Sequence, residues 1–253
     1  MTSVNLNLKK PYISQAICII SYELDKDIRY AQKAAEDHFG PMFSTQSQQT
    51  NVPDDFDPNA PRLIFQAGQA GSKQLMLSQA AAQYMLGFES SSEKSLDEQL
   101  GIISRNVKDF GSRTARFKSP KEIKEYALIL NINYPSKELT RDMMSSYLHQ
   151  RFFSFSPLGN VAATSLKVGY LVPEQLYLNI TSDIYELRKG QFKAEAGSQH
   201  VDLTTLPLAE QGFLVQIDLN TKPKTNCDIG DLDVIIDVSA NFIEKTLPDF
   251  MGF

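Results

Sequence analysis

One short run in the 253-residue chain comes close to a phosphate-binding pattern. Gly68 to Lys73 reads GQAGSK. A phosphate-binding loop needs G-x-x-x-x-G-K-[ST] between a strand and a helix, so that backbone amides and the helix N-terminus face the phosphates. Here the glycines are too close together, the serine and lysine are reversed, and strand-like residues follow. The run therefore predicts a hairpin turn and no nucleotide site.

A second group of residues could ligate a hard cation through carboxylate oxygens, namely Asp54, Asp55 and Asp57. The spacing of an EF-hand loop and its terminal glutamate are absent, and acidic residues among prolines are ordinary loop chemistry. The group therefore predicts a polar loop, and no metal or cofactor is expected.

The three histidines, His38, His149 and His200, have no zinc-binding spacing around them. His200 and Asp202 would lie on one face of a strand, which would permit a histidine–carboxylate pair. Because no candidate nucleophile lies nearby in the sequence, we predict no catalytic residue and do not expect an enzyme.

Seven basic residues gather between positions 105 and 124 of an otherwise acidic chain with a formal net charge of −5. Few aromatic residues interleave with them, so stacking on single-stranded nucleic acid has weak support. Two interpretations stay open: a solvated helix face with its linker, or a site for an anionic partner (nucleic acid, nucleotide or acidic protein). The residues are Arg105, Lys108, Arg113, Arg116, Lys118, Lys121 and Lys124.

Composition sets the broad class of the protein. Hydrophobic residues make up 42% of the chain and charged residues 22%, which is typical of a globular protein. The two cysteines form no C-x-x-C motif, residues 1–10 are polar, and no apolar run reaches the ~20 residues that a membrane span needs. These features favour a cytoplasmic protein without a membrane partner.

Hydrophobic periodicity divides the chain into two parts, 1–120 and 121–253. The first part begins with a strand and a helix, and Gly40-Pro41 should end this helix. A long polar loop, 44–61, follows. The expected elements of this part are a strand at 16–22, a helix at 27–39, strands at 62–66, 74–78 and 83–88, and a helix opened by the capping box Ser95–Glu98.

The second part repeats this order of elements. A strand at 126–133 precedes a helix that Ser136 should cap, and three strands then lead to a final amphipathic helix beyond Gly230. Those three strands are expected at 163–171, 175–180 and 212–219. The sequence therefore predicts an α+β protein of two similar β-α-β-β-(β)-α halves. Their antiparallel sheets carry helices on one face, join into one curved sheet, and are related by a pseudo-twofold axis.

Three segments resemble a known family. They are LKKPYISQAI at 8–17, PRLIFQ at 61–66 with QLML at 74–77, and FLVQID at 213–218 before a helix that ends in phenylalanine. The set is similar to a sporadically distributed, functionally uncharacterised bacterial family of similar length. Patchy distribution is typical of defence or toxin–antitoxin cargo, which the resemblance therefore implies.

Two functions remain open. The first is a non-catalytic partner-binding protein, antitoxin-like or regulatory, that binds a neighbour-encoded protein through sheet edges or through loop 44–61. The second is a small-ligand-binding domain with an apolar cavity between a curved sheet and a helix. The aromatic residues that would line this cavity are Phe65, Tyr84, Phe88, Tyr170 and Tyr177.

Overall fold

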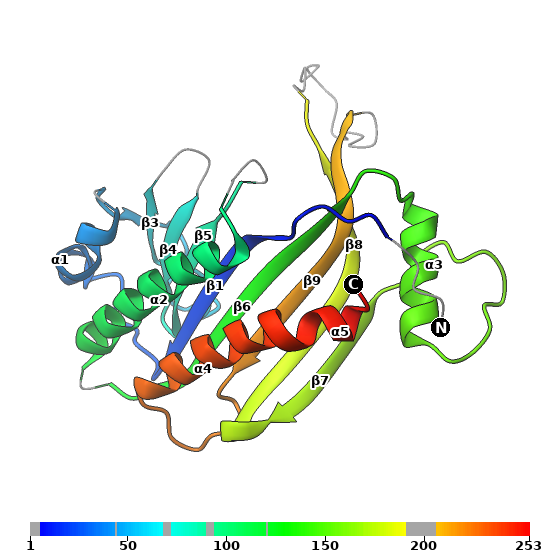
Figure 1. The fold of residues 1–253 in the computed structure, drawn as a ribbon. Coiled ribbons are helices and arrows are strands. Elements are labelled where there is room, and N and C mark those ends of the chain that lie inside the picture. Colours follow the sequence, from blue (N-terminus) through cyan, green and yellow to red (C-terminus); the bar gives the residue numbers. More distant parts are fainter. Residues whose placement is uncertain (1–5, 44, 68–71, 90–93, 120, 191–205) are drawn as a thin grey trace.

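The computed structural model describes residues 6–43, 45–67, 72–89, 94–119, 121–190 and 206–253. Its nine strands form one antiparallel sheet in the order β2-β3-β4-β5-β1-β6-β9-β8-β7 (Figure 1). The predicted α+β class is confirmed, and the sheet is single and continuous. Among the described residues, no helix combines the length and the hydrophobicity that crossing a membrane would require.

The elements follow the expected order along the chain, except that the short strand β2 lies within the predicted loop 44–61. The first part contains β1 (Tyr12–Tyr22), α1 (Gln32–Phe43), β2 (Gln48–Gln49), β3 (Leu63–Ala67), β4 (Lys73–Leu77), β5 (Ala81–Gly87) and α2 (Leu96–Lys118). The second contains β6 (Ile123–Ser136), α3 (Arg141–Phe152), β7 (Leu166–Val172), β8 (Leu176–Arg188), β9 (Leu208–Asn220) and α4 (Gly230–Asn241). A π-helical turn (Phe242–Thr246) then joins α4 to α5 (Leu247–Met251).

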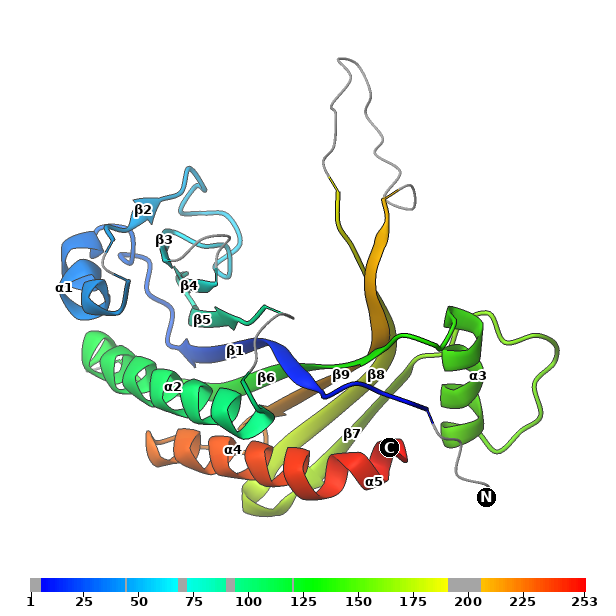
Figure 2. The same cartoon turned by 45° about the horizontal axis from the view of Figure 1, so that its top comes forward.

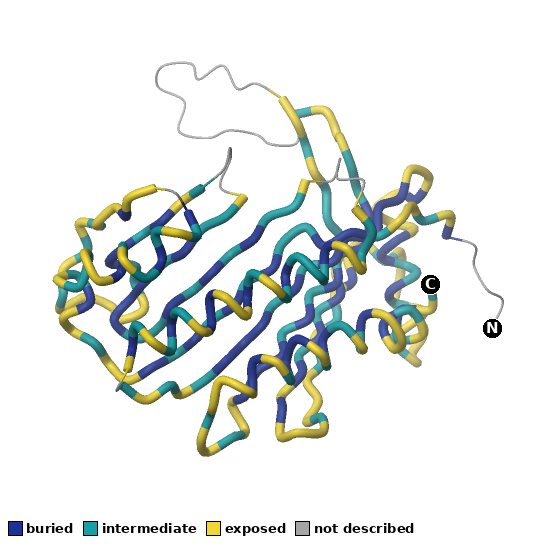
Figure 3. Tube along the Cα trace, turned by 60° about the vertical axis from the view of Figure 1, so that its left-hand side comes forward, coloured by how far each residue is buried: buried dark blue, intermediate teal, exposed yellow. Residues whose placement is uncertain are grey.

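One face of the sheet is covered by α2, α4 and α5, and no described helix lies over the other face (Figure 2). Alternate residues of each strand point to the covered face. On the paired central strands β1 and β6, Cys18 lies opposite Leu128 and Ala16 opposite Leu130, and all four are buried. Figure 3 shows these buried positions along the strands and on the sheet-facing side of the helices.

Three helix boundaries differ from the prediction. Helix α1 begins at Gln32 and not at residue 27, since residues 26–31 form turns. Gly40-Pro41 does not end α1, which continues through Pro41 to Phe43. The reason is burial: Phe43 is 3% exposed, and its ring lies 5.6 Å from that of Phe65. This contact offsets the helix-breaking tendency of proline. Ser136 is not the cap of α3, because β6 remains paired with β9 up to that residue. Thr140 caps α3 instead, whereas the predicted capping box Ser95–Glu98 is confirmed at the start of α2.

The two parts of the chain meet at the pair β1–β6. From this junction outwards, the strand order is β1-β5-β4-β3-β2 in the first part and β6-β9-β8-β7 in the second. The smaller helices are placed differently, since α1 packs on α2 and β3 while α3 contacts β8 at the other end of the molecule (Figure 1). Internal duplication and a pseudo-twofold axis stay predictions.

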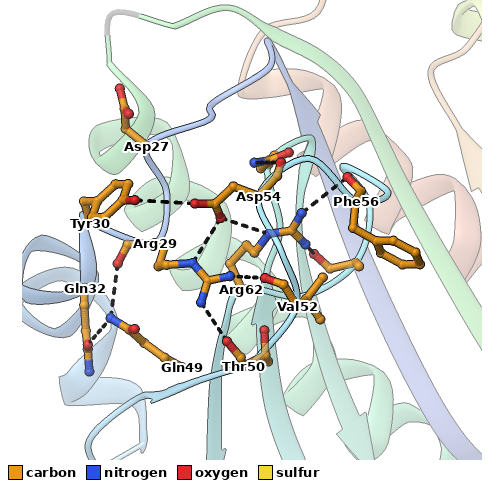
Figure 4. Close-up of polar contacts among 12 residues, drawn as sticks. Asp27, Arg29, Tyr30, Gln32, Gln49, Thr50, Val52, Asp54, Phe56 and Arg62 are labelled. Atoms are coloured by element: carbon orange, nitrogen blue, oxygen red, sulfur yellow. Dashed lines mark hydrogen bonds and ion pairs between the residues drawn. The ribbon is translucent and has the colours of Figure 1, made fainter.

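The polar loop between β2 and β3 is held by two arginines (Figure 4). Arg62 is fully buried, and its guanidinium donates hydrogen bonds to the carbonyls of Ala60, Phe56 and Asp57. Asp54 lies 3.0 Å from Nε of Arg29 and 3.6 Å from Nε of Arg62. The loop is therefore tied to the turn that precedes α1, through Arg29, and to Arg62, the residue directly before β3.

Replacing Arg62 by methionine removes the donors of three loop carbonyls while keeping the length of the side chain. Hydrogen bonds from a charged donor contribute about 1.5–3 kcal/mol, and the Arg62 side chain that makes them is fully buried, so we expect R62M to lower the free energy of unfolding by about 2–3 kcal/mol. Lys33→Met is the control, because Lys33 forms an exposed pair with Asp37 whose loss should cost less than about 0.5 kcal/mol. Urea denaturation measures the free energy of unfolding of both variants. Equal stability of R62M and the wild type would contradict this role of Arg62.

Candidate functional site: the open face of the sheet

We call the face opposite α2 and α4 the open face. Ile17 and Ile19 of β1 and Ile129 of β6 point to it and are partly exposed. Their neighbours along the strands are amides, hydroxyls and carboxylates. An uncovered sheet face of this mixed character is a surface on which another molecule can be bound.

A row of hydrogen-bonded side chains, the amide row, crosses four strands of the open face. Gln15 Nε2 donates to the sulfur of Met85 over 2.8 Å, and Asn131 Nδ2 donates to Gln15 Oε1 over 3.1 Å. Gln216 Nε2 then donates to Asn131 Oδ1 over 3.0 Å. Because Gln15 and Asn131 each donate one hydrogen bond and accept another, the row fixes the orientation of these two amides.

A second row, the tyrosine row, runs parallel to the first one. Ser14 Oγ donates to Asn133 Oδ1 over 3.2 Å, and Asn133 Nδ2 donates to the Tyr12 hydroxyl over 3.0 Å. The hydroxyls of Tyr12 and Tyr185 both donate to Glu210 Oε1, over 2.7 and 2.8 Å. Two phenols from strands far apart in the sequence thus converge on one carboxylate.

Ionisation of these phenols is suppressed. Burial raises the pKa of Tyr12 to about 12, and the hydrogen bond to Glu210 raises it as well, against the lowering effect of Asn133. Burial also raises the pKa of Tyr185, with the same carboxylate adding to the effect. Both hydroxyls therefore remain donors at neutral pH, and neither is suited to act as a general base.

A pocket of about 610 Å³ lies beside the two rows. Its wall combines rings and aliphatic side chains with amides and hydroxyls, which is a common composition of ligand pockets. The lining residues are Tyr12, Ser14, Phe88, Glu89, Asn131, Asn133, Tyr185, Leu187, Lys189 and Leu214.

The open face carries both carboxylates and lysines, since Lys167 of β7 points to it and Lys189 lines its pocket. Asp218 accepts hydrogen bonds from the amides of Asn179 and Asn220 over 3.1 Å each. Burial raises the pKa of Glu125, and the negative charge of Asp218 raises it further, against Lys222. In the described part of the chain, no lysine or arginine lies within 4.0 Å of four carboxylates of this face, which are Glu125, Asp183, Glu210 and Asp218.

The seven basic residues lie on α2 and at the start of β6, and most of them have acidic partners. Arg116 donates to the carbonyl of Ser112 in its own helix, and Arg105 is exposed. The ion pairs are Lys108–Asp233, Arg113–Asp109, Lys118–Asp25, Lys121–Asp25 and Lys124–Glu122. These pairs reduce the positive charge available to an anionic partner.

Lys118 is the most deeply buried of the seven. Its side chain is 2% exposed, and Nζ lies 2.8 Å from Asp25 and 4.2 Å from the centre of the Tyr22 ring. Burial lowers the pKa of Lys118 despite the hydrogen bond from it to Asp25. Burial alone would raise the pKa of Asp25, but the hydrogen bond and charge of Lys118 lower it overall. Lys118 thus joins α2 to the end of β1.

The five aromatic residues predicted to line a cavity lie in three places. Phe65 and Tyr84 are buried on the covered face, where both rings contact Phe43. Phe88 lines the pocket of the open face. Tyr170 and Tyr177 are 43% and 37% exposed at the edge formed by β7 and β8.

The remaining candidates also take defined positions. Lys73 begins β4, with Nζ 5.5 Å from the centre of the Phe43 ring. Asp54 binds arginines, as described above, and Asp57 Oδ1 accepts the backbone amide of Asn59. His38 and His149 contact aromatic rings. Gly68–Gly71, His200 and Asp202 lie outside the described residues.

Sequence reasoning missed both rows of the open face. A signal was present, because Gln15 interrupts an apolar strand and Asn131 and Asn133 alternate with apolar residues in the next one. Alternation places such residues on the face opposite the core. Which of these side chains meet depends on the register between strands.

No protein-family model matches the chain, and no curated protein matches it.

Tyr12→Phe tests the tyrosine row. The variant loses the hydrogen bond that the Tyr12 hydroxyl donates to Glu210, and Asn133 loses the hydroxyl that accepts its own hydrogen bond. We therefore expect the free energy of unfolding to fall by about 2 kcal/mol at neutral pH. Tyr177→Phe is the control and should change stability by less than about 0.5 kcal/mol. Equal effects of Y12F and Y177F in urea denaturation would contradict this role of Tyr12.

Tyr12→Phe should also change how the free energy of unfolding depends on pH. In the folded protein Tyr12 holds its proton to about pH 12, whereas in the unfolded chain it ionises near its ordinary value of 10. Its stabilising contribution is therefore complete below pH 10 and is lost as pH rises from 10 to 12. We expect Y12F to lose less stability over this interval than Y177F does.

Proposed function

We propose that this chain is a non-catalytic binding protein that docks a positively charged segment of a protein partner on its open face. The observation that carries the proposal is the pair of hydrogen-bonded rows across an otherwise uncovered sheet. Side chains that are already ordered lose little further entropy when a partner binds, which favours affinity. The partly exposed Ile17, Ile19 and Ile129 supply apolar contact area between polar groups.

The sign of the charge supports a basic partner. Four carboxylates of the open face, Glu125, Asp183, Glu210 and Asp218, have no cation of the described chain within ion-pair distance, although Lys167 and Lys189 lie on the same face. Nucleic-acid binding requires neutralisation of phosphates, which this face is poorly suited to provide. A lysine- or arginine-bearing polypeptide is complementary to it.

The resemblance to a sporadically distributed bacterial family adds an expectation about the partner. We propose that it is encoded beside this chain, as in a defence or toxin–antitoxin operon, and that this chain regulates it. We further propose that the two halves arose by duplication. The matching strand order outward from the β1–β6 junction supports that origin.

A matched pair of charge variants tests the docking surface. Asp183→Lys with Asp218→Asn adds three positive charges to the open face. Asp249→Lys with Glu244→Gln adds the same charge at exposed positions of the helical layer. Each protein is used as bait in an extract of the native host, and binding of the recovered partner is then measured with purified proteins at several salt concentrations.

We expect the open-face variant to bind the partner at least ten-fold more weakly and with a smaller dependence on salt, while the control binds like the wild type. Circular dichroism checks that both variants fold. Equal weakening by both variants would locate the partner elsewhere. Purification of the chain alone with no partner would count against the proposed function, and native mass spectrometry would then reveal a retained small molecule, the alternative that the 610 Å³ pocket favours.

A further inference from the structure

The two edges of the sheet are protected differently. At one edge, β2 is only two residues long, and the side-chain amide of Gln49 donates hydrogen bonds to Gln32 Oε1 over 2.8 Å and to the carbonyl of Arg29 over 3.4 Å. Helix α1 and the turn before it therefore flank this edge (Figure 2). At the other edge, β7 is seven residues long, and its pairing within the described chain is with β8 alone.

The outer side of β7 has unused backbone hydrogen-bonding groups. In an antiparallel ladder, alternate residues direct their N–H and C=O groups towards each neighbouring strand, so an edge strand leaves one set unused. Among the described residues, none outside β8 forms a backbone hydrogen bond with Leu166–Val172. Figure 1 shows β7 as the outermost strand on that side. A further β-strand fits this edge.

The side chains of β7 do little to prevent such pairing. Edge strands are commonly protected by proline, bulges or charged residues. Strand β7 has one charged residue, Lys167, contains no proline, and keeps a regular register with β8. Tyr170 is 43% exposed and Leu171 73% exposed. Because neighbouring residues point to opposite faces, Leu171 lies on the open face and Tyr170 on the covered face, so apolar surface borders the edge on both sides.

A glycine lets a ring from the neighbouring strand reach the edge. A Cβ at Gly169 would lie 2.3 Å from the hydroxyl oxygen of Tyr177, so the Tyr177 side chain extends from β8 over the backbone of β7. Tyr177 is 37% exposed. An apolar side chain of a strand added to β7 would contact this ring.

We propose that the strand added to β7 is β7 of a second copy of this chain, paired antiparallel about a twofold axis at Tyr170. A twofold contact uses the same surface on both subunits, so that surface must be complementary to itself. With Tyr170 opposite its own equivalent, Leu171 of each copy lies opposite Gly169 of the other. There it packs beside the Tyr177 ring of that copy, and the contact occurs twice.

The charges at the two ends of β7 favour this arrangement. Lys167 precedes the exposed centre of the strand, and Glu174 follows its end. In the described chain neither side chain has an oppositely charged group within 4.0 Å. In the proposed register Lys167 lies opposite Pro173 of the second copy, next to Glu174 of that copy, so opposite charges meet on both sides of the axis. A parallel pair in register would instead bring the two Lys167 side chains together.

The proposed dimer has a defined relation to the open face. Opposite residues of an antiparallel pair share a face, so the twofold axis is perpendicular to the sheet and both open faces point to the same side. The dimer does not depend on the proposed docking function. If both hold, a partner with two basic segments gains affinity by binding both copies at once.

Sedimentation equilibrium of the full-length protein tests the dimer, and we expect a mass that rises from one chain to two with concentration. Leu171→Lys removes apolar contact twice per dimer and places a charge against the Tyr177 ring, so dimerisation should weaken at least about ten-fold. Leu24→Lys is the matched control, because Leu24 is 51% exposed and follows β1, away from this edge. It should dimerise like the wild type.

Disulfide formation tests the register and does not depend on the folding of Leu171→Lys. In a Cys227→Ser background, Tyr170→Cys should form a cross-linked dimer on mild oxidation, because opposite residues of two strands lie within disulfide range. Tyr30→Cys, at a tyrosine that is 75% exposed, should remain a monomer.

The proposal would be overturned by a wild-type protein that stays monomeric at every concentration, by equal dimerisation of the two lysine variants, or by equal cross-linking of the two cysteine variants. A monomeric wild type that recovers a different protein from a host extract, when Leu171→Lys does not, would assign this edge to that protein and also overturn the proposal.

Discussion

Pairing of β1 with β6 joins strands that would otherwise belong to separate sheets, and both faces of the molecule depend on its register. On one face it sets Cys18 against Leu128 and Ala16 against Leu130 beneath the helices. On the other it brings Gln15 next to Asn131, the central link of the amide row. A slip of one residue would exchange the two faces, exposing the apolar set and burying the amides. The core and the candidate binding surface are therefore specified by the same set of backbone hydrogen bonds.

The two faces handle buried polar groups in different ways. On the open face, amides, phenols and carboxylates satisfy one another across strands, so that Tyr12 can be 6% exposed without an unpaired hydroxyl. On the covered face, the packing of α2 against α4 is close only where Gly111 and the Lys108–Asp233 pair allow it. Away from that contact, Ser239 remains unpaired. The first arrangement produces an ordered polar surface, and the second leaves one buried hydroxyl without a hydrogen bond.

Local signals in the sequence were sufficient for most of the elements and for few of the contacts. The capping box at Ser95 and the apolar strands were recognisable because their physical causes are local. Pro41 was misjudged because distant packing of Phe43 outweighs a local preference. Tyr12 and Glu210 are 198 residues apart, so their hydrogen bond was not predictable without the strand order. The basic residues were conspicuous in sequence, yet acidic residues from elsewhere, such as Asp25 and Asp233, pair with them in space.

The completeness of the two rows also limits how a partner can be recognised. Gln15 and Asn131 each donate one hydrogen bond and accept one within the amide row, and a partner that broke these bonds would have to replace them. The carboxylates keep further hydrogen-bonding capacity, because their oxygens accept several hydrogen bonds each. Ile17, Ile19 and Ile129 lie on the side of the amide row away from the tyrosine row and offer apolar contact. Charge on the partner would then mainly govern the rate and selectivity of association, and apolar contact would supply much of the affinity. Recognition of this kind favours a basic segment with aliphatic side chains over a purely charged one.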